Sequence, residues 1–174
     1  MIMPNLKIRE LRDAVFHTAP CCYKHLKRIA QGWTPKVKQL KDKLREFEFN
    51  AHSAKLPRKI PETNCCLINR YRDGQDSMGF HSDGEVALGK NPFLLLVSLG
   101  EECIFSFKHI VSGEIKSVSL PHGTVVLMYG HHLQRNWQHG LRKTKDQKRQ
   151  AMRINLSFRH HISKEAWSRV KGRI

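Results

Sequence analysis

The sequence predicts a mainly β protein with helices at its amino-terminal end, folded as a sandwich or jelly roll. Beyond residue 63, six or seven short strand-like segments follow one another closely, and few helical segments separate them. One segment, Phe93–Leu99, is apolar almost throughout, as expected of a strand that is covered on both faces. These features favour a sandwich or jelly roll over a β-α-β fold. With 174 residues, the chain is expected to form a single domain.

The first 60 residues are expected to be helical and strongly basic. Residues 35–49 show the apolar spacing of three, four and three that is typical of an amphipathic helix. The apolar positions are Val37, Leu40, Leu44 and Phe47. Its polar face carries Lys36, Lys38, Lys41, Lys43 and Arg45, which fit either plain solvation or contact with phosphates. Two further helices are expected around Lys7–Phe16 and Tyr23–Ala30.

The strands follow a proline-containing loop at residues 51–63. Two of them alternate between apolar and polar residues and flank the turn Ser112–Gly113, which is the pattern of a β-hairpin. The expected strands are Cys65–Tyr71, Phe93–Leu99, Cys103–His109, Ile115–Leu120, Thr124–Met128 and Arg153–Arg159.

Charge and cysteine content narrow the class of protein. Lys and Arg total 31 against 15 Asp and Glu, a net charge of +16. A surface this basic attracts polyanions, chiefly nucleic acid and less often acidic membranes or proteins. The five cysteines form no disulfide framework and are expected to be reduced thiols of an intracellular protein, in cytoplasm or nucleus. No apolar run reaches 18 residues, and the charged amino terminus does not resemble a secretory signal.

The motif His81–Ser82–Asp83 predicts a metal site. Residues i and i+2 of an extended segment project from the same face, so this imidazole and carboxylate are able to grip one ion together. A histidine from a distant strand would complete a facial triad with open positions, which suits non-haem Fe(II). His139 is the natural third ligand. The histidines that compete with it are His109, His131, His132, His160 and His161.

The last predicted strand carries a second signal. Arg153, Asn155, Ser157 and Arg159 alternate with apolar residues and therefore share one face. The strand is either at an edge, with this face in water, or its arginines meet buried carboxylates. A dicarboxylate co-substrate would supply such carboxylates, and the arginine fork binds them through two parallel hydrogen bonds.

Several motifs, in this order and spacing, resemble the AlkB family of Fe(II)/2-oxoglutarate-dependent nucleic-acid dealkylating dioxygenases. The resemblance covers roughly residues 64–160, and Trp33-Thr-Pro looks like the family's lead-in. The matching runs are Asn69-x-Tyr71-Arg72-Asp73-Gly74-x-Asp76-x-x-Gly79-x-His81-Ser82-Asp83-x-Glu85, Ser98-Leu99-Gly100 with Phe105, Leu120-Pro121-His122-Gly123 with Met128, Trp137-x-His139, and Arg153-x-Asn155-x-x-x-Arg159.

The resemblance implies a double-stranded β-helix (jelly roll, cupin-like) with its catalytic core at residues 64–160. Residues 1–60 would then contain the substrate lid, and residues 161–174 would be a basic tail. It also implies Fe(II), 2-oxoglutarate and O2 as cofactors, with nucleic acid as the partner of a monomeric enzyme that binds no membrane. Its implied catalytic and metal-binding residues are His81, Asp83, His139 and, beside the metal, Arg159. Its implied 2-oxoglutarate contacts are Asn69, Tyr71, Arg153, Asn155 and Arg159.

The implied reaction is oxidative demethylation of N-alkylated bases, such as 1-methyladenine and 3-methylcytosine, in DNA or RNA. It releases formaldehyde, succinate and CO2. Glu85 would face the exocyclic amine of the damaged base, and His81 would cover one face of that base. Trp33, Phe16 and Tyr23 are candidates for the other face, although each also suits the core. Arg72 and Asp76 are expected among the substrate contacts.

Two other functions remain open. The same iron chemistry would serve to hydroxylate a protein side chain or an undamaged base. A non-catalytic basic binding module would need neither three metal ligands nor two inward arginines.

Overall fold

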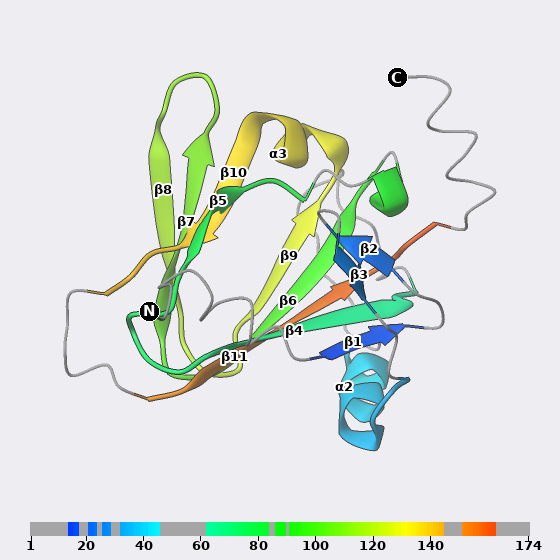
Figure 1. Cartoon of the computed structure of the whole chain (residues 1–174). Coiled ribbons are helices and arrows are strands. Elements are labelled where there is room, and N and C mark those ends of the chain that lie inside the picture. Colours follow the sequence, from blue (N-terminus) through cyan, green and yellow to red (C-terminus); the bar gives the residue numbers. More distant parts are fainter. Residues whose placement is uncertain are drawn as a thin grey trace.

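Two antiparallel β-sheets make up most of this computed structural model (Figure 1). The structure describes residues 14–17, 21–23, 26–28, 32–45, 62–83, 86–89, 91–144 and 151–162. The larger sheet has the strand order β1-β4-β11-β6-β9, and the smaller sheet has the order β5-β10-β7-β8. The fold class predicted from the sequence, a mainly β jelly roll, is confirmed.

The strands of the larger sheet are mostly those that alternation and apolar runs predicted. They are β1 (Ala14–His17), β4 (Cys65–Tyr71), β6 (Phe93–Gly100), β9 (Val125–Tyr129) and β11 (Arg153–Arg159). Strand β11 pairs with β4 on one side and β6 on the other along its whole length. It is therefore a central strand, which excludes the alternative of an edge strand with its polar face in water and confirms that this face is turned into the protein.

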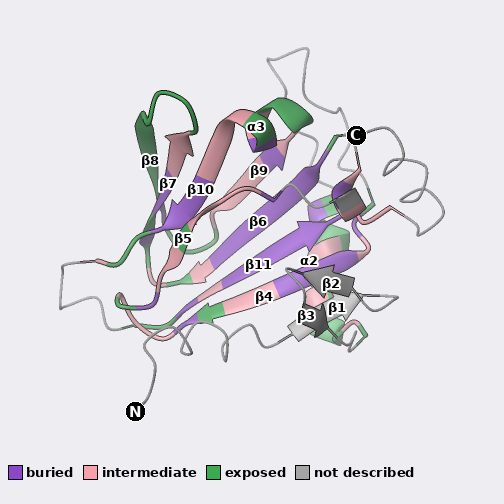
Figure 2. Cartoon of the chain, turned by 45° about the horizontal axis from the view of Figure 1, so that its top comes forward, coloured by how far each residue is buried: buried purple, intermediate pink, exposed green. Residues whose placement is uncertain are grey.

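The smaller sheet is built around one hairpin. Its strands are β5 (Met78–His81), β7 (Cys103–His109), β8 (Ile115–Leu120) and β10 (Trp137–Leu141), and the short helix α3 (His131–Asn136) leads into β10. Strands β7 and β8 form the hairpin that alternation predicted. Strand β8 is the edge, and all of its residues except Leu120 are exposed (Figure 2).

Two apolar clusters hold the layers together. Strand β6 contributes to both, because its alternate side chains point to opposite faces, which accounts for its continuous apolar run. Between the two sheets, Leu94 and Leu96 pack in one cluster with Phe105 and Leu141. On the outer face of the larger sheet, Leu44 of helix α2 packs in the other, whose strand members include Cys66, Leu95, Leu156 and Phe158.

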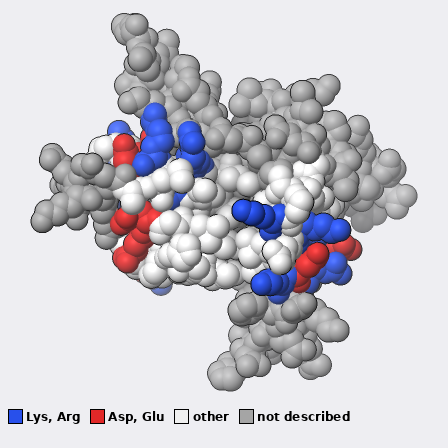
Figure 3. Space-filling view, turned by 90° about the horizontal axis from the view of Figure 1, so that it is seen from below, with Lys and Arg blue, Asp and Glu red and all other residues white. Residues whose placement is uncertain are grey.

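Helix α2 (Pro35–Arg45) has the predicted start and amphipathic face, and ends at Arg45. Residues 46–49, which completed the predicted helix, lie outside the described residues. Figure 3 views the side of the molecule that carries α2 and shows Lys and Arg side chains there beside acidic ones. Lys41 lies over the Trp33 ring, 4.7 Å from its centroid, and Arg45 pairs with Glu62 at 3.7 Å.

The helix predicted over Tyr23–Ala30 is wrong, because β2 (Cys21–Tyr23) and β3 (Leu26–Arg28) form a two-stranded antiparallel pair there. The helix predicted around Lys7–Phe16 is wrong at its end, where β1 pairs with β4; the rest of it lies outside the described residues. Local helix propensity is a weak prior, and pairing to the free edge of β4 overrides it.

A three-residue 3-10 turn (Val86–Leu88) completes the described elements. Within the described ranges, no helix has both the length and the apolar character needed to cross a membrane.

Candidate metal and co-substrate site

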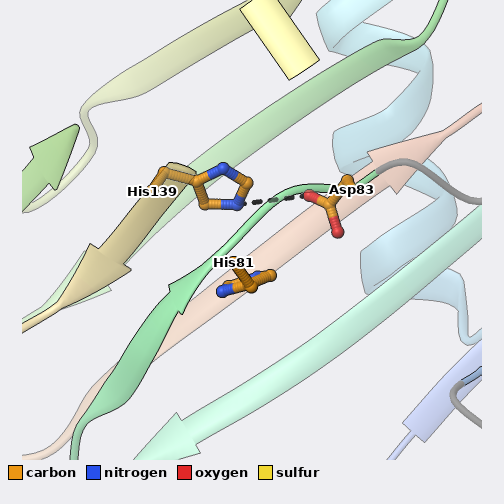
Figure 4. Close-up of side chains that lie close together, drawn as sticks. All are labelled: His81, Asp83 and His139. Carbon is orange, nitrogen blue, oxygen red and sulfur yellow. Dashed lines mark ion pairs between the residues drawn. The ribbon is translucent and has the colours of Figure 1, made fainter. Parts of the chain in front are cut away.

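Strands β5 and β10 bring two histidines and one aspartate together at the mouth between the sheets (Figure 4). His81 at the end of β5 is the register partner of His139 in β10. Their ring centroids are 4.4 Å apart, and Asp83 follows two residues after His81. The potential ligand atoms of His81, Asp83 and His139 all lie within 4.8 Å of one another. No other such cluster of His, Cys, Asp or Glu occurs in the described part of the chain.

Asp83 is fully buried and surrounded by groups that favour its charged form. Arg159 of β11 donates to its Oδ1 at 3.1 Å, and His139 Nε2 lies 3.3 Å from its Oδ2. Burial alone raises the pKa of Asp83, but the Arg159 guanidinium and the two nearby histidines together hold that pKa well below its usual range. The side chain is therefore a carboxylate at neutral pH, which is the form that binds a metal ion.

The local backbone orients both ends of the His81–Asp83 segment. His81 Nδ1 lies 2.9 Å from the Gly79 carbonyl oxygen. Because a carbonyl only accepts, Nδ1 carries the proton in this hydrogen bond and Nε2 is left as the metal-binding nitrogen. The backbone N–H of Asp83 donates to Gln134 Oε1 at 2.9 Å, which anchors the carboxylate-bearing residue to helix α3.

A cavity between the sheets runs from this triad to Arg153. The polar face of β11 lines it, together with Asn69 and Tyr71 of β4. Apolar walls come from both sheets. They include Leu67, Met78, Leu96, Phe105 and Leu141.

Arg153 is only 5% exposed, and no carboxylate among the described residues pairs with it. Its Nε donates to Ser98 Oγ at 3.1 Å, one terminal nitrogen donates to Asn155 Oδ1 at 3.3 Å, and its guanidinium lies 5.1 Å from the Tyr71 ring centroid. Asn69 Oδ1 is also buried and accepts no hydrogen bond from any described residue. A buried cation and a buried polar atom of this kind fit a bound dicarboxylate.

The triad likewise fits Fe(II). Two imidazoles and one carboxylate on one side of an ion form the facial set of non-haem iron sites, which leaves other positions for co-substrate and O2. The chain therefore has the donor set for the metal at one end of the cavity and a cation for a carboxylate at the other.

Three of the residues expected to contact substrate, Arg72, Asp76 and Trp33, do not line this cavity. Arg72 and Asp76 pair with each other through two side-chain hydrogen bonds, of 2.9 and 2.8 Å, and so brace the turn after β4. Trp33 stacks on Phe158, on the outer face of the larger sheet. That face is opposite to the one that carries Arg159, so Trp33 fills the core role rather than covering a base.

Three other expected positions are not described in enough detail to be placed. Glu85 lies outside the described residues. Phe16 and Tyr23 belong to β1 and β2, but the described part of the structure does not include their side chains.

Sequence reasoning missed the residues that support the site. Gln134, buried in α3, and Ser98, buried in β6, carry no local signal, because their partners are 51 and 55 residues away along the chain. Ser98 belongs to a motif matched above, but only its contact with Arg153 gives it a role at the site.

A family model described as the 2OG-Fe(II) oxygenase superfamily matches residues 5–159. The alpha-ketoglutarate-dependent dioxygenase alkB homolog 3 of Bos taurus is 32% identical over 136 residues, covering 73% of this chain and 43% of that protein. The DNA oxidative demethylase ALKBH2 of Bos taurus is 38% identical over 104 residues, covering 55% and 36%. A solved structure of OsALKBH1 has a TM-score of 0.48 and 21% identity, covering 91% of this chain and 65% of that one. The chain spans less than half the length of the two bovine relatives.

Proposed function

The chain belongs to the 2OG-Fe(II) oxygenase superfamily and, within it, to the AlkB family, and from this membership we propose that it oxidatively removes methyl groups from base nitrogens in nucleic acid. The observation that carries the proposal is the cavity that joins the His81–Asp83–His139 triad to a buried arginine without a carboxylate partner among the described residues. The names of the two bovine relatives, a dioxygenase and a DNA oxidative demethylase, support the same class of activity.

In this proposal, each end of the cavity has its own task. His81, Asp83 and His139 would hold Fe(II), and Arg159 keeps Asp83 charged and in place. Arg153 would bind the distal carboxylate of 2-oxoglutarate, with Asn69, Tyr71 and Asn155 beside it. When bound, iron and 2-oxoglutarate supply an oxidation that consumes O2, yields succinate and CO2, and releases the methyl group as formaldehyde.

The remaining residues position and shield the reaction. The apolar walls formed by Met78, Phe105 and Leu141 keep water away from the buried charges and strengthen their interactions. The damaged base must leave its stack to reach the triad, which costs a few kcal/mol and less for a lesion that pairs poorly. The net charge of +16 supplies the attraction for phosphates that holds the strand meanwhile.

The test is formaldehyde release from oligonucleotides that carry 1-methyladenine or 3-methylcytosine, as single strands and duplexes of DNA and RNA. Fe(II), 2-oxoglutarate and ascorbate are present, with a chelated control. Chelator-sensitive release is expected from the purified chain, and the four-way comparison assigns the preferred strand and sugar. Asp83→Ala should abolish release, because it removes a metal ligand.

Two outcomes would overturn parts of this proposal. Succinate formation without formaldehyde from any of these oligonucleotides would keep the oxygenase but move the substrate to a protein side chain or an undamaged base. Full activity of the Asp83→Ala variant would show that the metal lies elsewhere.

A further inference from the structure

The inner face of the smaller sheet continues beyond the triad on the side away from the co-substrate cavity. In β10, Trp137, His139 and Leu141 share one face, because alternate residues of a strand do so. Leu141 lines the cavity that contains Arg153, and Trp137 does not. Trp137 therefore lies on the opposite side of the ligand His139 from the co-substrate cavity, roughly 6.6 Å along the strand.

Trp137 stands in a row of aromatic and cationic side chains. Its register partner His109 lies edge-on to it, with ring centroids 4.9 Å apart. Lys116 of β8 places its Nζ 5.5 Å from the centroid of the Trp137 ring. Lys116 is the register partner of Phe107, whose ring lies 6.5 Å from that of His139. Phe107, His109, Trp137 and Lys116 are referred to below as the aromatic–cationic shelf.

The position of the shelf relative to the triad is held by a backbone contact. Ser82 lies between the ligands His81 and Asp83, and its Oγ donates to the Trp137 carbonyl oxygen at 3.1 Å. The three rings are half-buried. The Lys116 side chain is 65% exposed, and its Nζ lies 3.3 Å from Oε1 of Glu114, which is also exposed. An ion pair between two exposed side chains contributes little, so the shelf presents ring surface and an ammonium that a phosphate is able to reach, directly beside the metal ligands.

We propose that the aromatic–cationic shelf binds an unpaired nucleotide next to the target base, with its base against Trp137 and its phosphate near Lys116. This inference rests on the proposed function, since it adds a neighbouring contact to the same nucleic-acid site. Aromatic side chains beside cations are the usual platform for single strands, because every base has a face that stacks on an aromatic ring. A base inside a duplex already has both faces covered by its neighbours.

Charge and continuity identify a polyanion as the occupant. The chain carries a net charge of +16, and the shelf continues directly from the triad along β10. A partner recognised through apolar contacts alone would gain nothing from the exposed Lys116 ammonium. The occupant is therefore a single-stranded stretch of the nucleic acid that presents its lesion to the triad.

The experiment measures binding of an unmethylated single-stranded oligonucleotide to the metal-free chain by fluorescence anisotropy over a series of salt concentrations. Trp137→Leu keeps an apolar side chain but removes the stacking surface, and is expected to weaken binding about fivefold or more. Trp137→Phe should retain most of the affinity. With the matching duplex, Trp137→Leu should have a smaller effect.

Lys116 offers a test with a matched control. Lys116→Gln is expected to reduce the slope of log affinity against log salt by about 0.7, the loss of one phosphate contact by a single strand. Lys108 lies on the outer face of the same sheet, where its Nζ is 5.9 Å from the Phe80 ring centroid. Lys108→Gln removes the same charge and should leave the slope unchanged.

Three results would overturn the proposal that the shelf binds a nucleotide. The first is an unchanged affinity of Trp137→Leu for the single strand, and the second is an equal effect of Trp137→Leu on the affinities for duplex and single strand. The third is an equal loss of salt dependence in Lys116→Gln and Lys108→Gln. If Trp137→Leu fails to fold by circular dichroism, the exposed Lys116 position still decides the question. Because binding is measured on undamaged strands without iron, failure of the shelf is distinguishable from failure of the dealkylation reaction.

Discussion

Asp83 and Arg153 are both buried and charged, but they differ in how their charges are balanced. Asp83 meets Arg159 at 3.1 Å inside the protein. Arg153 meets only a hydroxyl, an amide oxygen and the Tyr71 ring among the described residues. Desolvating a guanidinium without a carboxylate is unfavourable. The chain therefore keeps at Arg153 a positive charge that a bound dicarboxylate is suited to neutralise.

Replacing Arg153 should raise the apparent KM for 2-oxoglutarate. Arg153→Ala removes a charge-assisted contact worth about 1.5–3 kcal/mol, which corresponds to a rise of about tenfold to hundredfold. The KM of Arg153→Lys should lie between that of Arg153→Ala and that of the wild type, because an ammonium does not bind a carboxylate in the same forked way. Succinate formation as a function of 2-oxoglutarate concentration gives the values.

Arg70 provides the control for this prediction. It lies in β4 beside Tyr71, but on the opposite face, and is exposed. Arg70→Ala should leave the KM for 2-oxoglutarate unchanged. An equal rise in both variants would show that the arginines act through overall charge or stability.

Cys66 gives the stability of the fold a dependence on alkaline pH. Burial raises the pKa of its thiol above the ordinary value of 9.0, against the opposing effects of Arg159 and a backbone hydrogen bond from Ser157. The thiol is neutral when protonated, so its contribution to stability is complete below pH 9.0 and is lost as pH rises toward the higher folded pKa. Between about pH 8 and 10 the expected loss is about 1.4 kcal/mol.

Chemical unfolding across this pH range measures that dependence. Cys66→Ala should remove the loss of about 1.4 kcal/mol between about pH 8 and 10, whatever the absolute stability of the variant. Ser106→Ala, which also alters a fully buried side chain but removes no titrating group, should retain the wild-type dependence. A Cys66→Ala curve parallel to that of the wild type would contradict the assignment.

At the level of elements, β11 explains why both arginines face the cavity. It is hydrogen-bonded on both sides, so its two faces are buried by opposite layers. Leu156 and Phe158 face helix α2, and Arg153 and Arg159 face the smaller sheet. The strand thereby carries one cationic group to each end of the co-substrate cavity.

The turn from β6 into β7 sets the start of β11 and depends on Gly100. Its φ is +88°, and a Cβ there would approach the Met152 carbonyl oxygen to 2.2 Å. Gly100→Ala should therefore lower the free energy of unfolding by roughly 2–4 kcal/mol, through backbone strain and the clash next to Arg153. Gly113, in the β7–β8 turn, has φ +71° but open space around it. Gly113→Ala should lower the free energy of unfolding by only roughly 1 kcal/mol.

Urea unfolding of the two glycine variants compares these values. The difference between them isolates the steric contact, because both positions share a left-handed backbone. Equal destabilisation would mean that Met152 moves aside without cost.

For the molecule as a whole, the site links the two sheets. The triad comes mainly from β5 and β10 of the smaller sheet, and both arginines come from β11 of the larger one. A metal and a dicarboxylate that bind here stabilise the folded state, because the unfolded chain lacks the site.

Redox-inert Mn(II) with 2-oxoglutarate should raise the thermal midpoint of the chain. At concentrations about 100 times the dissociation constant, the gain is about 2.7 kcal/mol, or roughly 5–10 °C for a chain of this size. A chelator should reverse the shift. Asp83→Ala should abolish the metal-dependent part, and an undiminished shift in that variant would place the metal outside the triad.

Much of the fold could be predicted because the necessary pattern is local. Alternation along Cys103–His109, Ile115–Leu120 and Arg153–Arg159 defines these strands to the residue. The same periodicity shows that His81 and Asp83 share a face. The helix predicted over Tyr23–Ala30 is wrong, because the strand conformation of Cys21–Tyr23 and Leu26–Arg28 depends on pairing rather than on propensity.

The sequence by itself determined six of the strands that follow residue 63, the polar face of β11, the H-x-D motif and the basic charge of the chain. Strands β5 and β10, which carry the histidine ligands, were not among the six. Only the tertiary structure decided which histidine joins that motif, that β11 is central, and that Trp33 packs on the outer face. The physical reason is that periodicity reports the direction of neighbouring side chains along one segment. The pairing of His81 with His139, and of Asp83 with Arg159 76 residues away, is set instead by strand order and packing between sheets.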